Sequence, residues 1–136
     1  MASVKPVDLL AATFKAIRDR NSLDTNLVED AIIGCVSPVK DQGANIAKAA
    51  AIEAGYAETT AGVQVNRFCA SGLEAINMAA AYVGSGNADL LVAGGVESMS
   101  SIPHLVYGAR FGTRYGGLKN IDMLLETLTD KYTGLP

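Results

Sequence analysis

The hydrophobic and polar residues of this chain alternate between a helical period and a strand period up to about residue 98. Helices are expected over 6–21, 41–55 and 70–83, and strands over 31–36, 62–68 and 89–94. The strand at 89–94 is apolar on both faces, which is typical of a parallel strand covered by helices. This alternation predicts an α/β fold.

The periodicity also predicts which helix faces point inward. Pro6 suits the first position of a helix, and Asp24 is expected to cap a short turn after it. Gly55 is expected at the C-cap of the helix over 41–55. The inward positions of these two helices are expected to be Val7, Leu10, Phe14 and Ile17 in the first, and Ile46, Ala49, Ala50 and Ile52 in the second.

Two later segments differ from the rest in their hydrophobic pattern. The helix over 70–83 is apolar nearly all round, so we expect it to be buried inside a protein. Beyond Ser98, "SIPHLVYGARFGTRYGGLKN" shows no clear period and predicts a long loop. Asn120 is then expected to cap a last helix over 121–128.

Composition excludes several function classes. The 136 residues are 49% hydrophobic and 18% charged, which is typical of one globular domain. A net charge of −3 gives no electrostatic footprint for nucleic acid or an anionic membrane, so we expect neither as a partner. No window approaches the roughly 18 uncharged apolar residues that a membrane span needs.

The chain has two cysteines, Cys35 and Cys69, and one histidine, His104. Two cysteines are too few for a disulfide framework, so we expect free thiols in a reducing compartment. A structural zinc site of four Cys and His ligands cannot be assembled from three such residues. Cys35 falls within the predicted strand over 31–36, where core packing is expected.

Cys69 lies between a predicted strand and the start of a predicted helix. A thiol there sits at the positive end of the helix dipole, which favours the thiolate form. The unpaired N–H groups of that helix end can also hold an oxyanion when the thiolate attacks a carbonyl. The alternative is that Cys69 fills a core as a small hydrophobe, since free cysteine is among the most buried residue types.

A longer motif surrounds Cys69. The stretch "VNRFCASGLEAINMAAAYVGSGNADLLVAGGVESMS" resembles the acyl-enzyme signature of thiolases, the acetyl-CoA acyltransferases. The VN-x-x-C-x-SG core, the small-residue helix and GG-x-ES-MS stand in order, and the resemblance extends over residues 6–136. It implies a thiolase-like fold in which Cys69 accepts the acyl group of an acyl-CoA as a thioester.

The resemblance further implies two parts, a partial N-terminal thiolase domain over 6–97 and the start of a CoA-binding loop domain over 98–136. It implies acyl-CoA and CoA as substrates, no metal or bound cofactor, a homo-oligomer or a complementing thiolase chain as partner, and a location in the cytoplasm or an organelle matrix. The reaction is thiolytic cleavage of a 3-ketoacyl-CoA or Claisen condensation of acetyl-CoA.

Several family features have no match in this chain. The opening strand is missing, and the whole second half is missing with its GHP histidine, its second cysteine and its NEAF asparagine. The resemblance implies that the missing strand lies at the centre of the first sheet, so we expect an open slot between two flanking strands and self-association through exposed edges. Both ends of the chain therefore look cut, and we expect the first half of the thiolase-like fold to be incomplete.

Three functions stay open on these observations. The chain supplies the nucleophile of an acyltransferase, or it is a non-catalytic fragment or partner subunit that needs another chain. A decarboxylating ketoacyl synthase relative shares a nucleophilic cysteine, but the VN-x-x-C context favours a thiolase.

Other candidate residues are expected to be structural. His104 lies outside any GHP context and is expected to be solvated or structurally hydrogen-bonded rather than catalytic. Glu97 and Ser98 are expected to hold the GG-x-ES-MS turn. Gly84-Ser85-Gly86 follows a helix rather than opening one, so it is not a dinucleotide-binding loop. Three basic residues are expected in a solvated loop rather than on a CoA phosphate, namely Arg110, Arg114 and Lys119.

Overall fold

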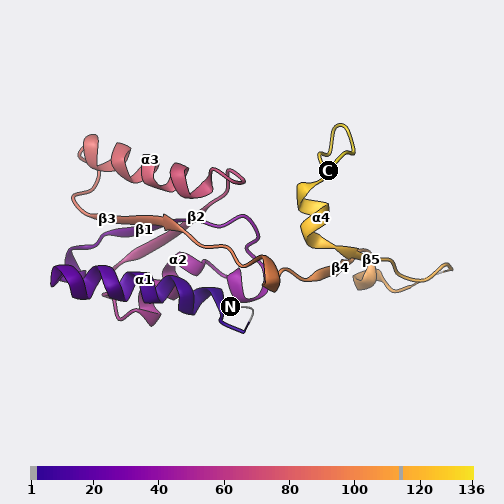
Figure 1. Cartoon of the computed structure of the whole chain (residues 1–136), viewed down its shortest axis with the longest axis horizontal. Coiled ribbons are helices and arrows are strands. Elements are labelled where there is room, and N and C mark those ends of the chain that lie inside the picture. Colours follow the sequence, from indigo (N-terminus) through magenta and orange to yellow (C-terminus); the bar gives the residue numbers. More distant parts are fainter. Residues whose placement is uncertain (1–2, 114) are drawn as a thin grey trace. The chain divides into compact units, whose positions relative to one another are not determined.

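The computed structural model describes residues 3–113 and 115–136, which form two compact units divided between Ser98 and Met99. The first unit holds six main elements. They are α1 (Pro6–Asn21), β1 (Asp30–Gly34), α2 (Ile46–Glu53), β2 (Ala61–Val65), α3 (Ser71–Gly84) and β3 (Leu91–Gly95). The three strands form one parallel sheet in the order β2-β1-β3. Figure 1 shows α3 on one face of this sheet and α1 with α2 on the other. The predicted α/β fold is confirmed.

The centre of the sheet is occupied by β1. Ile32 of β1 pairs with Val63 of β2 on one side and with Ala93 of β3 on the other. The expectation of an open central slot is therefore wrong, because both hydrogen-bonding edges of the middle strand are already used. The outer edges of the described sheet belong to β2 and β3.

The core lies between the sheet and the pair α1 and α2. Successive residues of a strand point to opposite faces, so Ala31, Ile33 and Cys35 share the α1 and α2 face. They belong to one cluster of buried residues with Leu10, Phe14, Ile46 and Ala50. Ile32 and Gly34 take the opposite face, toward α3. The chain thus builds its main core on one side of the sheet only.

The helix faces are rotated relative to the prediction. Leu10 and Phe14 are buried as expected, but Ile17 is 39% exposed. In α2, Ala49 and Ile52 are exposed, and Ala47 and Ala51 are buried instead. Helix α2 also begins later than predicted, at Ile46, where the Asn45 side chain accepts the Lys48 N–H at 3.2 Å. The predicted positions of Pro6 and Asp24 are confirmed, whereas the C-cap of α2 is Ala54, and Gly55 follows it with a φ of 74°.

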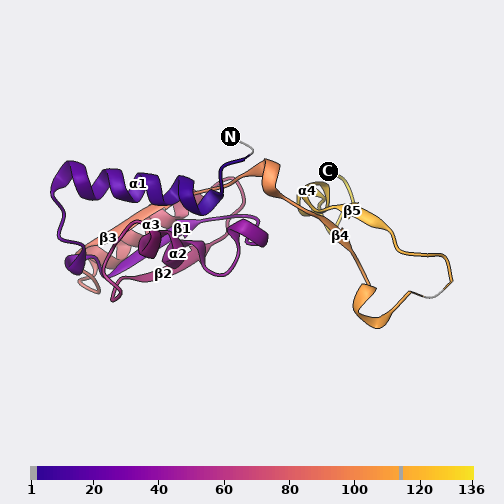
Figure 2. The ribbon, with the colours of Figure 1, turned by 90° about the horizontal axis from the view of Figure 1, so that it is seen from below.

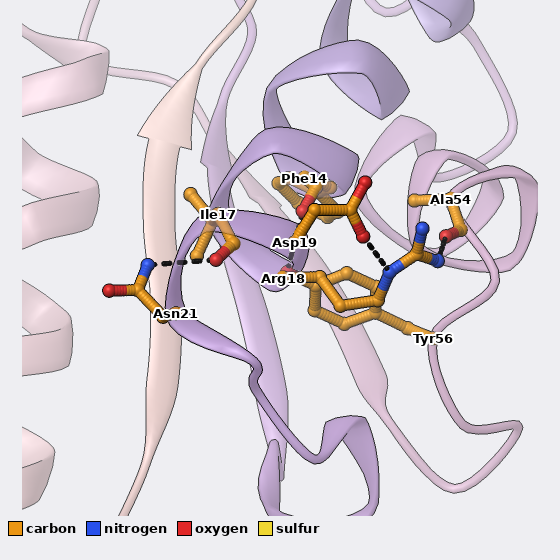
Figure 3. Close-up of polar contacts among 7 residues, drawn as sticks. All are labelled: Phe14, Ile17, Arg18, Asp19, Asn21, Ala54 and Tyr56. Carbon is orange, nitrogen blue, oxygen red and sulfur yellow. Dashed lines mark hydrogen bonds and ion pairs between the residues drawn. The ribbon is translucent and has the colours of Figure 1, made fainter.

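Polar contacts join the C-terminal ends of α1 and α2, as Figure 3 shows. The Tyr56 hydroxyl donates to the Phe14 carbonyl at 3.0 Å, and the two rings lie with centroids 5.3 Å apart. The Arg18 guanidinium donates to the Ala54 carbonyl and pairs with Asp19 at 2.8 Å. The Tyr56 and Arg18 contacts tie α1 to the end of α2, and the ribbon is seen from the side of these two helices in Figure 2.

The third helix is less buried than its composition predicts. Only Ser71 and Ala75 of α3 are buried, and Leu73 and Ile76 are 62% and 52% exposed. The all-round burial expected for this helix is therefore wrong for the chain as described: one face packs on the sheet and the other is open. None of the described helices is long and apolar enough to cross a membrane.

The second unit begins at Met99 and contains more structure than the expected loop. Strands β4 (His104–Val106) and β5 (Asn120–Asp122) pair antiparallel, and α4 (Met123–Leu128) follows directly. Asp122, not Asn120, caps that helix by accepting the Leu124 N–H at 2.9 Å. None of the described residues of this unit is fully buried. Its assignment as the start of a CoA-binding loop domain stays a prediction.

Candidate active site

Cys69 lies in the turn that joins β2 to α3, at the edge where the parallel strands end. It precedes the first residue of α3, Ser71, by two positions, and its side chain is exposed. The carboxyl edge of a parallel sheet is the usual place for a ligand site in α/β proteins. The reading of Cys69 as a core residue is therefore wrong.

Two side chains hold this turn, which we call the thiol turn and define as residues 66–71. The Asn66 carboxamide oxygen accepts the Phe68 N–H at 2.9 Å. The buried Ser71 hydroxyl accepts the Arg67 N–H at 2.8 Å and donates to the Phe68 carbonyl at 2.5 Å. Between them Phe68 adopts a φ of 48°, a left-handed conformation that is unfavourable for a bulky residue. The residue before Cys69 is thus held in a strained conformation by its neighbours.

The start of α3 rests directly on the sheet because Gly34 has no side chain. A Cβ atom at Gly34 would lie 2.5 Å from the Ser71 carbonyl carbon and 2.6 Å from the Gly72 nitrogen. Sequence reasoning missed this role, although an isolated glycine inside the strand pattern "AIIGCV" is a signal of close backbone approach.

Two early amides of α3 follow Cys69 closely, those of Gly72 and Leu73, whereas the Ser71 N–H donates to the Phe68 carbonyl at 3.0 Å. Within the described residues, the N–H groups of Gly72 and Leu73 donate no hydrogen bond. Such amides are the unpaired donors of a helix N-terminus, and they can receive a developing negative charge. The turn therefore brings together an exposed thiol and free backbone donors.

A second group of contacts lies beside the thiol turn, where the segments after β1 and β3 meet. The Glu97 carboxylate accepts the Val36 N–H at 2.7 Å and the Gln42 side-chain amide at 2.9 Å. Gln42 is 1% exposed; its amide also donates to the Ser37 carbonyl at 2.9 Å, and its oxygen accepts the Ser98 N–H. The expected structural role of Glu97 and Ser98 is confirmed. Gln42 was not foreseen from the sequence.

Cys35 has the opposite environment to Cys69. It is 2% exposed and belongs to the main core, which confirms the packing role, although it follows β1 rather than lying within it. Burial raises the pKa of the Cys35 thiol to about 11, and the nearby Glu97 charge adds to the shift. At neutral pH this thiol stays protonated.

Most of the remaining candidates lie in the second unit. His104 belongs to the second unit, where it lies exposed in β4 opposite Asp122 rather than in a loop. Arg110 and Lys119 are exposed in the same unit, and Arg114 lies outside the described residues. Ser85 is the C-cap of α3, so the Gly-Ser-Gly segment ends a helix as expected. Residues 3–113 and 115–136 contain no group of three His, Cys, Asp or Glu arranged to hold a metal ion.

Comparison with known protein families settles where the chain belongs. A family model described as "Thiolase, N-terminal domain" matches residues 1–136. The chain belongs to the thiolase family. Its fold agrees with this, because the crystal structure of the Bacillus anthracis acetyl-CoA acetyltransferase superposes with a TM-score of 0.90. That superposition covers 98% of this chain and 34% of the other, at 33% sequence identity.

Curated relatives point the same way. A steroid 3-ketoacyl-CoA thiolase of Mycobacterium tuberculosis is 42% identical over 82% of this chain and 28% of its own length. An acetyl-CoA acetyltransferase of Chromobacterium violaceum is 37% identical over 97% of this chain and 34% of its own. This thiolase chain thus spans about a third of the length of such relatives.

Proposed function

We propose that this thiolase chain supplies the nucleophile of an acyl transfer between CoA thioesters, with Cys69 as the residue that carries the acyl group. The observation that carries the proposal is the thiol turn, in which an exposed cysteine stands beside the free amides at the start of α3. The family supports the substrate class, since the relatives from Mycobacterium tuberculosis and Chromobacterium violaceum are named for 3-ketoacyl-CoA and acetyl-CoA.

The proposed chemistry is an exchange of one thioester for another. The Cys69 thiolate attacks the thioester carbonyl of an acyl-CoA, and the oxygen gains negative charge beside the amides of Gly72 and Leu73. With acetyl-CoA, the intermediate then breaks its bond to the CoA sulfur, which leaves and takes up a proton. With a 3-ketoacyl-CoA, the thiolate attacks the 3-keto carbonyl instead, the C2–C3 bond breaks, and the C2 carbanion of the departing acetyl-CoA takes up the proton. The product is an acyl group on Cys69 and either free CoA or acetyl-CoA, each a substrate or product rather than a bound cofactor.

The test is to incubate the purified chain with acetoacetyl-CoA or acetyl-CoA and to measure its intact mass after acid quenching. We expect a mass increase of one acyl group, which peptide mapping assigns to Cys69. The Cys69→Ala variant should gain nothing, whereas Cys35→Ala should gain as much as the wild type. An acyl group that maps elsewhere, or none under any condition, contradicts the proposal.

A second function is favoured by a separate observation: the sequence holds one histidine, His104, which stands in SIPHLVYG and not in a GHP motif. We infer that the chain does not turn over by itself and acts with a partner, a second copy or a complementing thiolase chain. After acylation, a base must deprotonate CoA or a second acetyl-CoA, and losing one such group typically costs about 10²–10⁴-fold.

The two functions separate in an assay of acetoacetyl-CoA cleavage with CoA. The chain alone is expected to show acylation without turnover. Cleavage at about 1–10³ per second, abolished by Cys69→Ala, would show that a catalytic base lies within these residues and would overturn the need for a partner.

A further inference from the structure

We propose that Glu97 is a positioning residue for Cys69 and acts through Val36 and Asn66, which rests on the proposed function in taking Cys69 as the reacting group. Glu97 lies 28 positions after the cysteine, in the turn that follows β3. The hydrogen bonds around Val36 connect that turn to the thiol turn.

The connection starts at a buried anchor. Gln42 is 1% exposed and donates to one oxygen of the Glu97 carboxylate, which leaves the other oxygen to accept the Val36 N–H at 2.7 Å. Gln42 also donates to the Ser37 carbonyl, the next residue along the chain. Val36 and Ser37 are therefore fixed in place by two side chains, one of them charged.

From Val36 the connection continues to the thiol turn. The Val36 carbonyl accepts the Asn66 side-chain N–H at 3.2 Å, and the oxygen of the same carboxamide accepts the Phe68 N–H at 2.9 Å. Asn66 thus uses its donor on the segment held by Glu97 and its acceptor on the residue before Cys69. The described residues show no direct hydrogen bond between Glu97 and Asn66, so Val36 is the link between them.

The strained residue explains why such support matters. Phe68 keeps its unfavourable φ of 48° because hydrogen bonds from its neighbours hold it there. Cys69 is the next residue, so its position depends on that conformation. If Asn66 loses its fixed orientation, Phe68 can relax toward an ordinary conformation and carry the thiol away from the start of α3. Glu97 then controls where the thiol lies without touching it.

The test is a double-mutant cycle read on Cys69. The variants are Glu97→Gln, Asn66→Ala and the two combined, in the full chain. Glu53→Gln is the matched control, because it removes the same charge from an exposed ion pair with Lys15 at 3.6 Å. Iodoacetamide labelling of Cys69 is timed by peptide mass mapping, and the same chain unfolded in urea gives the reference rate for an unpositioned thiol.

We expect Asn66→Ala to slow the labelling of Cys69 by about three- to tenfold, toward the unfolded reference. Glu97→Gln should slow it less, and the combined variant should match Asn66→Ala alone, because both changes break one connection. Glu53→Gln should leave the rate unchanged. Acylation of Cys69 by acetoacetyl-CoA depends more on geometry than labelling by iodoacetamide does. In Asn66→Ala and in the combined variant its rate should fall by up to about a hundredfold.

Three results would overturn the inference. The first is a Glu97→Gln chain that unfolds more easily but whose Cys69 is labelled at the wild-type rate. The second is a combined variant whose labelling rate falls by the product of the two single effects. The third is a Glu53→Gln chain whose labelling rate falls as much as that of Glu97→Gln. Failure of the proposed function gives a different result, because wild-type Cys69 then forms no acyl-enzyme. In that case the iodoacetamide labelling of the variants still decides whether Glu97 positions the thiol.

Discussion

The two cysteines of this chain follow the carboxyl ends of neighbouring parallel strands, yet their environments are opposite. Cys35 comes directly after Gly34, the last residue of β1, and points into the core between the sheet and α1 with α2. Cys69 follows β2 after a short turn and is exposed at the start of α3. One thiol is 2% exposed with its pKa raised to about 11, and the other is open to solvent.

The difference shows that the residue type and the sheet edge do not decide the chemistry of a cysteine. The decisive features are the face of the sheet and the segment that follows. After β1 the chain enters a turn fixed by Glu97 and Gln42, whereas after β2 it enters a turn that places a helix N-terminus beside the thiol. Gly34 lies between the two sites, since its missing side chain makes room for the start of α3.

The largest expected effect comes from filling that room. Gly34→Ala places a Cβ against the backbone of Ser71 and Gly72, which cannot move as a flexible side chain can. We expect the free energy of unfolding to fall by about 3 kcal/mol in urea titrations, with slower labelling of Cys69. The matched control is Gly94→Ala, where an added Cβ meets no atom within 4 Å. Equal losses in the two variants would contradict the close approach.

The buried thiol predicts a pH dependence of stability. Its pKa is raised from 9.0 to about 11 on folding, so the unfolded chain ionises first as pH rises. The contribution of Cys35 is fully present below about pH 9 and is lost as pH rises toward 11. We expect about 2 kcal/mol less stability at pH 10.5 than at pH 8 from this group. Urea titrations should show a smaller loss in Cys35→Ala. Burial also raises the pKa of Tyr56, but Tyr56 is present in both chains and contributes equally to the pH dependence of each. Identical pH profiles would contradict the burial of Cys35.

A smaller effect is expected at the thiol turn itself. Ser71→Ala removes a buried hydroxyl that accepts the Arg67 N–H and donates to the Phe68 carbonyl. Unfolding should become easier by about 1–2 kcal/mol, with a slower reaction at Cys69. Ser85→Ala, which removes an exposed hydroxyl at the other end of α3, should change stability by less than about 0.5 kcal/mol. A Ser71→Ala chain that behaves like Ser85→Ala would show that Ser71 does not hold the turn.

Much of the first unit could be predicted from the sequence because its signals are local. Pro6, Asp24 and Gly55 mark element ends through backbone preferences that hold in any context; Pro6 and Asp24 are found at those ends, and Gly55 directly follows the C-cap of α2. The position of Cys69 before a helix follows from the same kind of signal. The family motif adds the expected chemistry.

Tertiary contacts decided the features that could not be predicted. Ile17 and Ile52 fit the helical period but stay exposed, because α2 buries Ala47 and Ala51 instead of Ile52, and α1 buries Leu10 and Phe14 but not Ile17. The short strands β4 and β5 pair across a long loop, and pairing between distant residues leaves little periodic signal in segments of three residues. Gln42 is a polar residue and would be expected at the surface from the sequence alone. Its burial is explained by its hydrogen bonds with Glu97 and Ser98.

The most direct test of the central claim compares the two thiols in one folded chain. A limiting amount of iodoacetamide at pH 7.5 is followed by denaturation, a second label of different mass, and peptide mapping of each cysteine. A raised pKa of about 11 alone leaves Cys35 with about a hundredfold less thiolate than an ordinary cysteine. We therefore predict that Cys69 takes the first label and Cys35 takes it only after unfolding. Labelling of Cys35 first, or of both at similar rates, would contradict the assignment of Cys69 as the nucleophile.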